Sequence, residues 1–214
     1  MVNRLPAICK TLGTAFGLLL IAALPAQANT KRPETITGVV TAVDDGDTLT
    51  LQADDGRCIE VRMSDYDSPE IAHRPGQTPA CGGSPGNWPP APYPGQPGGE
   101  DAGKVLRDLA LGHRATALCY GSGGYGRLAC HVTVDGQVES LNRQVIRAGW
   151  GLIFTRSNWV HDPQSRAIEA EAIAAHRGRW GLPAWQALDP YWWRTNCWKK
   201  GGGQPDNCPG ASAK

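Results

Sequence analysis

The sequence has 214 residues and a formal net charge of +1, with 41% hydrophobic and 19% charged residues. This length suggests one domain with extensions, and the apolar share suffices for a hydrophobic core. The near-zero charge excludes a general electrostatic attraction to nucleic acid. Any binding of phosphate must therefore depend on local clusters of charge or on a bound cation.

The first 28 residues have the features of a secretory signal peptide. Arg4 and Lys10 give a positive start, and the apolar run over residues 15–24 is too short to span a bilayer. The sequence AQA at residues 26–28 is a cleavage site of the small-x-small type, which predicts removal of residues 1–28. The alternative is an uncleaved membrane anchor. After cleavage 19 basic residues face 20 acidic ones, and we expect a protein free of the membrane, in the periplasm or the medium.

Six cysteines remain in the mature chain, and an even number in an exported protein predicts disulfide bonds. They are Cys58, Cys81, Cys119, Cys130, Cys197 and Cys208. Many pairings are possible and the sequence does not choose among them, although Cys119–Cys130 and Cys197–Cys208 are candidates for local closures. A zinc site is the alternative, but the sequence has no CxxC or HxxxH pair to support it.

Three strands are predicted at the start of the mature chain. Residues 35–51 contain two strands around an acidic turn, with the alternation of polar and apolar residues that is typical of half-buried strands. The hairpin signal DDG at residues 54–56 leads into a third strand over residues 59–63. In this strand Arg62 lies on the face opposite to the apolar side chains. Pro69 ends the meander, because proline cannot continue an interior strand.

A loop and three helices are predicted in the rest of the domain. Residues 74–99 contain seven glycines and eight prolines, a composition that predicts a long surface loop. A helix is expected from about Glu100 to Leu111, and a second follows the cap residue Ser140. A third begins at the pair Asp162-Pro163, and two glycines at 178 and 181 close it.

Two further strands are predicted at residues 115–119 and 127–134, around a glycine-rich turn. Five short strands and three helices in this order predict an α+β protein with a mainly β core, an OB-fold-like five-stranded β-barrel. We expect this domain to span residues 29–185. A C-terminal extension rich in tryptophan, residues 186–214, follows it. Its tryptophans can stack on nucleic-acid bases or pack the extension onto the barrel, and we favour packing.

Three short clusters carry the candidate chemistry: DGDT at residues 45–48, the segment 62–70, and YGR at residues 125–127. Each has an ordinary structural explanation when it is taken alone. Asp-Gly is a common turn pair, crowded carboxylates can lie on a solvated turn, and the arginine can project from a surface hairpin.

Together the clusters supply what phosphodiester hydrolysis needs. Asp47, Asp67 and a backbone carbonyl are oxygen ligands that suit a hard cation such as Ca²⁺. Arg62 and Arg127 offer planar guanidinium groups that match phosphate oxygens. A third carboxylate, Glu70, can orient or deprotonate the attacking water.

The pattern DGDT, R-x4-D-x-P-E and YGR, followed by GRWGL at residues 178–182, resembles the staphylococcal nuclease (thermonuclease-like) family. The matching stretch runs from about Thr35 to Trp185. The resemblance implies a barrel of five strands with three helices. It also implies a Ca²⁺-dependent nuclease that cuts single-stranded DNA and RNA, internally and from the ends, between phosphorus and the 5′ oxygen.

The resemblance also implies roles for individual residues. Asp47, Asp67 and the carbonyl of Ser68 match the calcium ligands, and Glu70 matches the general base. Two arginines and a tyrosine match the substrate-binding positions, namely Arg62, Arg127 and Tyr125. The two arginines are expected to stabilise the transition state.

The sequence departs from the family pattern in several places. Gly123 and Gly124 stand where family members often carry an acid and a lysine. The aromatic residues that stack on the substrate base have no certain counterpart, with Phe154 and Trp159 as candidates. The loop at residues 74–99 begins just after the expected general base and can shape or cover the site.

Two other functions remain open besides a monomeric nuclease. One is a non-catalytic nucleic-acid-binding module on the same fold, since a fold does not determine a function. The other is a calcium-stabilised structural domain. The survival of all six carboxylate, carbonyl and arginine positions argues against the first, and the arginine pair argues against the second.

Overall fold

The structure is a computed structural model that describes residues 33–73, 80–81, 93–156, 162–184, 186–198 and 208. All of these belong to one unit, Lys31–Lys214. The predicted signal peptide, Trp159, Trp185 and most of the proline-rich segment lie outside the described residues. No helix in the described part of the chain is both long enough and apolar enough to cross a membrane.

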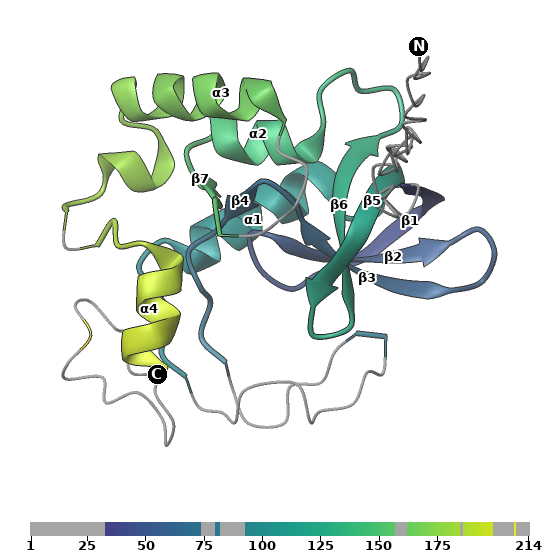
Figure 1. The fold of residues 1–214 in the computed structure, drawn as a ribbon, viewed down its shortest axis with the longest axis horizontal. Helices are drawn as coiled ribbons and strands as arrows, with labels where there is room; N and C mark the ends of the chain where they lie inside the picture. Colours follow the sequence, from purple (N-terminus) through teal and green to yellow (C-terminus); the bar gives the residue numbers. More distant parts are fainter. Residues whose placement is uncertain are drawn as a thin grey trace, which may run out of the picture. The chain divides into compact units, whose positions relative to one another are not determined.

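Five strands form a closed barrel in the order β1-β2-β3-β6-β5 (Figure 1). Neighbouring strands are antiparallel, except that β3 and β6 are parallel. The bounds are β1 Glu34–Val43, β2 Thr48–Ala53, β3 Cys58–Met63, β5 Arg114–Gly124 and β6 Arg127–Val134. The predicted fold class, α+β with an OB-fold-like five-stranded barrel, is therefore confirmed.

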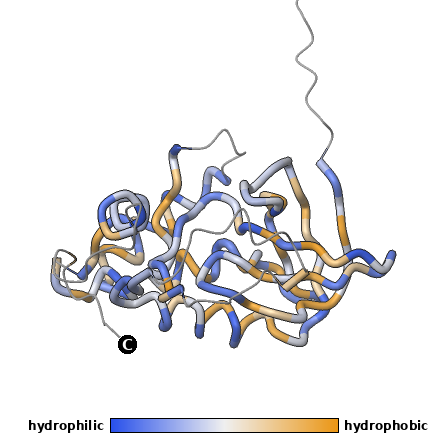
Figure 2. Tube along the Cα trace, turned by 90° about the horizontal axis from the view of Figure 1, so that it is seen from below, coloured by the Kyte–Doolittle hydropathy of each residue, from blue (hydrophilic) through white to orange (hydrophobic). Residues whose placement is uncertain are grey.

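The barrel interior is filled by apolar side chains that alternate along the strands, as expected when one face points inward. In β1, Ile36 and Val40 are buried while Val39 between them is exposed. Val61 and Met63 of β3 are fully buried, as the sequence pattern predicts. Figure 2 shows hydrophobic and hydrophilic residues interspersed along the chain.

The described residues form four α-helices rather than the three predicted. They are α1 Gly99–Ala110, α2 Leu141–Arg147, α3 Pro163–Ala174 and α4 Pro190–Cys197. The predicted caps are present, because the Ser140 side chain accepts from Arg143 N and the Asp162 side chain accepts from Gln164 N. The fourth helix, α4, lies in the C-terminal extension.

The third helix ends earlier than the sequence pattern predicts. It stops at Ala174, and the glycines expected to close it form a separate 3₁₀ turn, Gly178–Gly181. A small second sheet lies beside the barrel, in which β4 (Tyr66–Asp67) pairs with β7 (Leu152–Ile153). This sheet continues the chain directly after β3 and therefore determines where the segment 66–70 lies.

Three disulfides join the described cysteines. Cys119–Cys130 and Cys197–Cys208 are the two local closures considered from the sequence, and Cys58–Cys81 completes the set. Cys119–Cys130 links opposed residues of β5 and β6. Cys58–Cys81 ties the proline-rich segment to the start of β3, and paired backbone hydrogen bonds between His73 and Tyr93 join the two ends of that segment.

Candidate active site

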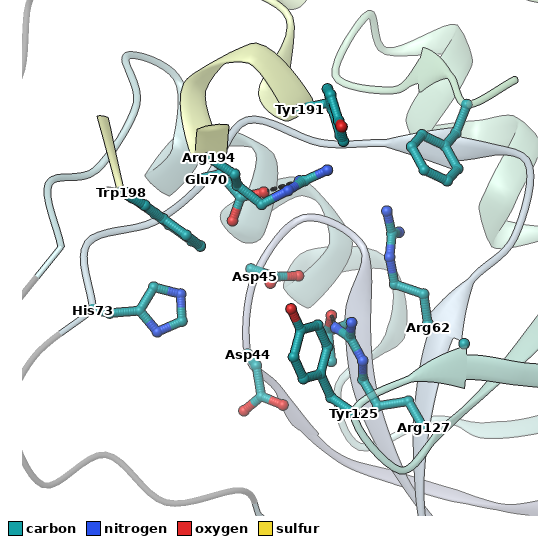
Figure 3. Close-up of a pocket in the computed structure, with 13 residues that line it drawn as sticks. Asp44, Asp45, Arg62, Glu70, His73, Tyr125, Arg127, Tyr191, Arg194 and Trp198 are labelled. Carbon is teal, nitrogen blue, oxygen red and sulfur yellow. Dashed lines mark hydrogen bonds and ion pairs between the residues drawn. The ribbon is translucent and has the colours of Figure 1, made fainter. Parts of the chain in front are cut away.

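A pocket of about 340 Å³ lies where the three sequence clusters meet (Figure 3). Arg62, Glu70, Tyr125 and Arg127 all line it, although they come from separate parts of the chain. Residues of the C-terminal extension line the same pocket, namely Tyr191, Arg194 and Trp198. The site therefore has a barrel side, which the sequence predicts, and a helical side, which it does not.

The barrel side centres on a buried ion-pair network. Arg62 Nη1 lies 2.9 Å from Asp47 Oδ2, and Arg62 Nη2 lies 2.6 Å from Asp67 Oδ1. All three side chains are at most 7% exposed. The guanidinium thus bridges the two carboxylates that the sequence predicts as cation ligands. Buried charges are tolerated in this way only when they are paired and hydrogen-bonded.

The DGDT turn places Asp47 within this network. Asp45 Oδ1 accepts from Asp47 N at 2.9 Å, which is the local bond that aspartate commonly makes in turns. Asp47 Oδ2 in turn accepts from Ser68 N at 2.8 Å and from Ser68 Oγ at 3.0 Å. The first cluster is therefore an Asp-Gly turn. It also places the Asp47 carboxylate in contact with Ser68 of the second cluster.

The backbone of Glu70 packs against the start of α1 and the residues just before it. Its carbonyl accepts from Gln96 N at 2.8 Å, and a Cβ on Gly99 would lie 2.2 Å from that carbonyl oxygen, so this approach requires glycine. Burial raises the pKa of the Glu70 carboxyl to about 8; Arg194 opposes this rise, and the charges of Asp67 and Asp47 add to it. A carboxylate with a raised pKa is a stronger base than an ordinary glutamate.

Arg127 begins β6 directly after the tightest turn of the barrel. Tyr125 and Gly126 have φ of 54° and 85°, as a two-residue hairpin turn with two left-handed residues requires. Arg127 Nη1 donates to Thr48 Oγ1 at 2.9 Å, and its guanidinium lies 5.5 Å from the Tyr125 ring centroid. The hairpin thus brings the third cluster to the other two.

The glycine before this turn has a packing role. A Cβ on Gly123 would lie 2.7 Å from Cβ of Arg62, so strand β5 can pass over Arg62 only without a side chain there. The glycine at this position therefore allows β5 to pack closely on Arg62. Of the two aromatic candidates, Phe154 lines the pocket.

Asp65 does not join the site, although it lies two residues from Asp67. Its φ of 75° turns the chain between β3 and β4. Asp65 Oδ2 lies 2.9 Å from His131 Nε2 and accepts from Asp162 N at 3.1 Å. The carboxylate therefore links the barrel to the start of α3. Of the acidic residues in the segment 62–70, Asp67 pairs with Arg62 and Glu70 lines the pocket, whereas Asp65 pairs with His131.

Arg194 is a residue of the candidate site that the sequence analysis does not identify, as are Tyr191 and Trp198. It comes from α4 and donates through Nη2 to Asp67 Oδ2 at 2.6 Å, through Nη1 to Asp67 Oδ1 at 3.1 Å, and also to Glu70 Oε1. Asp189-Pro190, at the start of α4, is the same cap signal that identified α3. The sequence could therefore have located the helix, but not its partner carboxylates.

The oxygen donors at the barrel side suit a hard cation in their chemistry. Asp47, Asp67 and Ser68 lie together, since Ser68 donates to Asp47 and one guanidinium bridges the two carboxylates. Two carboxylates and a carbonyl are donors typical of Ca²⁺, with water completing its coordination. Among the described residues no three His, Cys, Asp or Glu side chains form a metal-binding group, and arginines neutralise the carboxylates instead.

The fold and the site define the class of protein: an OB-fold-like barrel that presents carboxylates and arginines in one pocket. A model of the staphylococcal nuclease homologue family matches residues 60–181, more than half of the chain, and the chain belongs to this family. Its membership indicates a nuclease or a nucleic-acid-binding function. Asp47 lies just before the matched residues, and no curated protein matches the chain significantly.

Proposed function

We propose that this protein is an exported, calcium-dependent nuclease that hydrolyses phosphodiester bonds in DNA and RNA, with a preference for single strands. The observation that supports it most is the pocket that Arg62 and Glu70 share with Arg127, which comes from a distant part of the chain. A phosphodiester needs charge neutralisation, a grip on phosphate oxygens and an activated water, and this pocket contains a group for each.

Each residue has a part in this reaction. Arg127 binds a phosphate oxygen from the pocket side, because its other contacts, with Thr48 and Gly124, leave the guanidinium at the pocket wall. Arg62 adds positive charge beneath the phosphate. Glu70 accepts a proton from the water whose oxygen bonds to phosphorus, while the bond between phosphorus and the 5′ oxygen breaks and the leaving 5′ oxygen takes a proton from solvent. Tyr125, 63% exposed, can contact a base or a phosphate.

The cation belongs to the same proposal. Ca²⁺ held by Asp47, Asp67 and the carbonyl of Ser68 would stabilise the negative charge that develops on the phosphate. The three disulfides support an exported protein, because such bonds persist in oxidising compartments. We further propose a monomer with a signal peptide at residues 1–28, a nuclease domain at 29–185 and an extension at 186–214.

The first test is degradation of single-stranded DNA by the oxidised mature protein, with Ca²⁺ and with a chelator. We expect Glu70→Gln to lower the rate by at least about 10²-fold, the usual contribution of a general base. Glu100→Gln is the matched control, because Glu100 is exposed in the first turn of α1. If the folded wild type cuts nothing with any of several divalent metals, the nuclease proposal fails and a binding module becomes the better explanation.

A further inference from the structure

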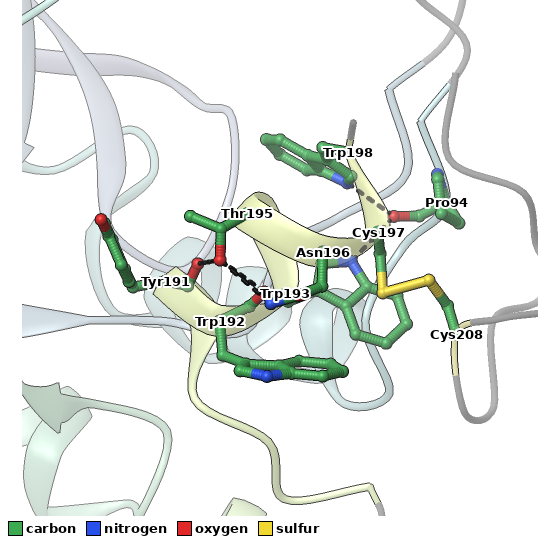
Figure 4. Close-up of a disulfide and its surroundings, with 9 residues drawn as sticks. All are labelled: Pro94, Tyr191, Trp192, Trp193, Thr195, Asn196, Cys197, Trp198 and Cys208. Carbon is green, nitrogen blue, oxygen red and sulfur yellow. Dashed lines mark hydrogen bonds between the residues drawn. A yellow bond between two sulfur atoms is a disulfide. The ribbon is translucent and has the colours of Figure 1, made fainter. Parts of the chain in front are cut away.

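The C-terminal extension holds α4 firmly against the pocket. Trp193 is fully buried, and its Nε1 donates to the Pro94 carbonyl at 3.1 Å. Trp198 Nε1 donates to the same carbonyl at 3.0 Å. The disulfide Cys197–Cys208 joins the end of the helix to a later residue of the extension, and both cysteines are buried with Trp193 (Figure 4). The backbone of α4 is thus anchored independently of any contact that Arg194 makes.

Arg194 places one positive charge between two carboxylates of the site. Its guanidinium binds both oxygens of Asp67 and one oxygen of Glu70. Figure 3 shows the contact with Glu70. Asp67 Oδ1 also accepts from Arg62. Both oxygens of Asp67 therefore bind arginine, and Glu70 carries a hydrogen bond on the carboxylate that must accept a proton from water.

The two arginines differ in how they can leave Asp67. Both line the pocket, but the Arg62 side chain is 7% exposed and pairs with two carboxylates of the barrel side, whereas the Arg194 side chain is 28% exposed. Rotation of the Arg194 side chain into the pocket needs no movement of Trp193 or of the disulfide. A long, partly exposed arginine on an anchored helix is suited to exchange with another cation.

We propose that Arg194 is a tethered competitor of the divalent cation: it occupies Asp67 and Glu70 when the cation is absent and is displaced when the cation binds. The proposal rests on the proposed function, because it takes Asp67 as a cation ligand. The C-terminal extension thereby sets the cation concentration at which the cation displaces Arg194 from Asp67 and Glu70. Electrostatic attraction favours the exchange, because a divalent ion carries two positive charges and the Arg194 guanidinium carries one.

The test measures Ca²⁺ binding by calorimetry on the full oxidised mature chain, without nucleic acid. Arg194→Gln is expected to bind Ca²⁺ about tenfold more tightly than the wild type, which corresponds to about 1.4 kcal/mol. Arg194→Lys, which keeps the charge but loses the planar fork, should fall between the two. Arg166→Gln is the matched control, because Arg166 is an exposed arginine of α3, and it should bind as the wild type does.

Each outcome decides the proposal. Unchanged or weaker Ca²⁺ binding in Arg194→Gln would show that Arg194 supports the site rather than competing for it. Equal binding in Arg194→Lys and the wild type, with Arg194→Gln unfolded, would also overturn it. Absence of Ca²⁺ binding in all variants would reject both the exchange and the calcium dependence. Nuclease activity of the wild type together with unchanged binding in Arg194→Gln would reject the exchange alone.

Discussion

The two sides of the pocket bind the same carboxylate in different ways. On the barrel side, Arg62 is paired in register with Thr48 across β2 and β3, and Met63 N donates to the Asp47 carbonyl at 2.7 Å. On the helical side, Arg194 reaches Asp67 from a helix that follows the family-matched residues 60–181. The strand register determines the position of one arginine, and the docking of an extension determines the other.

This difference separates an arginine that keeps the carboxylates buried from one that we propose to compete with the cation. Arg62 is buried with two carboxylates, so its charge is needed to keep both of them in the interior. Arg194 is partly exposed, and water can replace it at the carboxylates. The same 2.6 Å contact with Asp67 therefore has a larger energetic consequence on the barrel side than on the helical side.

The largest expected effect comes from removing the buried arginine. Arg62→Gln leaves Asp47 and Asp67 buried without their shared partner and should lower the free energy of unfolding by about 3–5 kcal/mol. Chemical denaturation of the oxidised protein measures this loss. Arg57→Gln is the control, because Arg57 is 48% exposed and solvent screens its ion pairs, so its loss should change the free energy of unfolding little. Equal losses in the two variants would contradict the comparison.

A smaller but still large effect is expected where α4 docks. Trp193→Ala removes a fully buried side chain, and the loss should be below the about 3–5 kcal/mol of a core truncation, because Trp193 packs in a small cluster of the extension outside the barrel core. We expect hydrogen exchange of α4 amides to speed up while the barrel strands stay protected. Trp192→Ala is the matched control, since Trp192 is 41% exposed on the same helix.

Trp193→Ala also tests how the two sides are connected. If α4 carries Arg194 to Asp67, loosening the helix should strengthen Ca²⁺ binding as Arg194→Gln does. Faster exchange in the barrel strands as well as in α4 would show instead that the extension and the barrel unfold as one cooperative unit.

Local signals predict the barrel side well. Alternating strands, the DDG hairpin signal and the caps at Ser140 and Asp162 each depend on neighbouring residues, and the structure contains them. The motif R-x4-D-x-P-E places Arg62, Asp67 and Glu70 within nine residues of one another in the chain. The end of β3 and the residues that follow it therefore supply three of the predicted site residues.

Two features needed the structure because they depend on tertiary geometry. The contact of Arg194 with Glu70 spans 124 residues, and no local pattern specifies such a partner. Asp65 and Asp67 would share a face in a regular strand, but the positive φ of Asp65 sends its carboxylate to His131 and α3 instead. Spacing in the sequence alone therefore does not show that Asp65 faces His131 while Asp67 faces Arg62.

The smallest predicted effect lies where the two sides meet, at His73. Its ring packs edge-on against Trp198 of the extension, with centroids 4.8 Å apart, and its backbone pairs with Tyr93. Burial, together with the charge of Arg127, lowers the pKa of His73 to about 4. The folded protein therefore binds this proton less readily than the unfolded chain, whose histidine titrates near 6.5.

The stabilisation from neutral His73 is present above about pH 6.5 and is lost as the pH falls toward 4, because the unfolded chain takes up the proton first. Between pH 7 and pH 5 the wild type should lose about 2 kcal/mol more than His73→Gln, as measured by denaturation at each pH. Carboxylates titrate in both proteins and cancel in this difference. His113→Gln, at an exposed position, should follow the wild type. Parallel pH curves for His73→Gln and the wild type would show that His73 accepts a proton in the folded protein as easily as in water, and that the junction between the extension and the barrel is open to solvent.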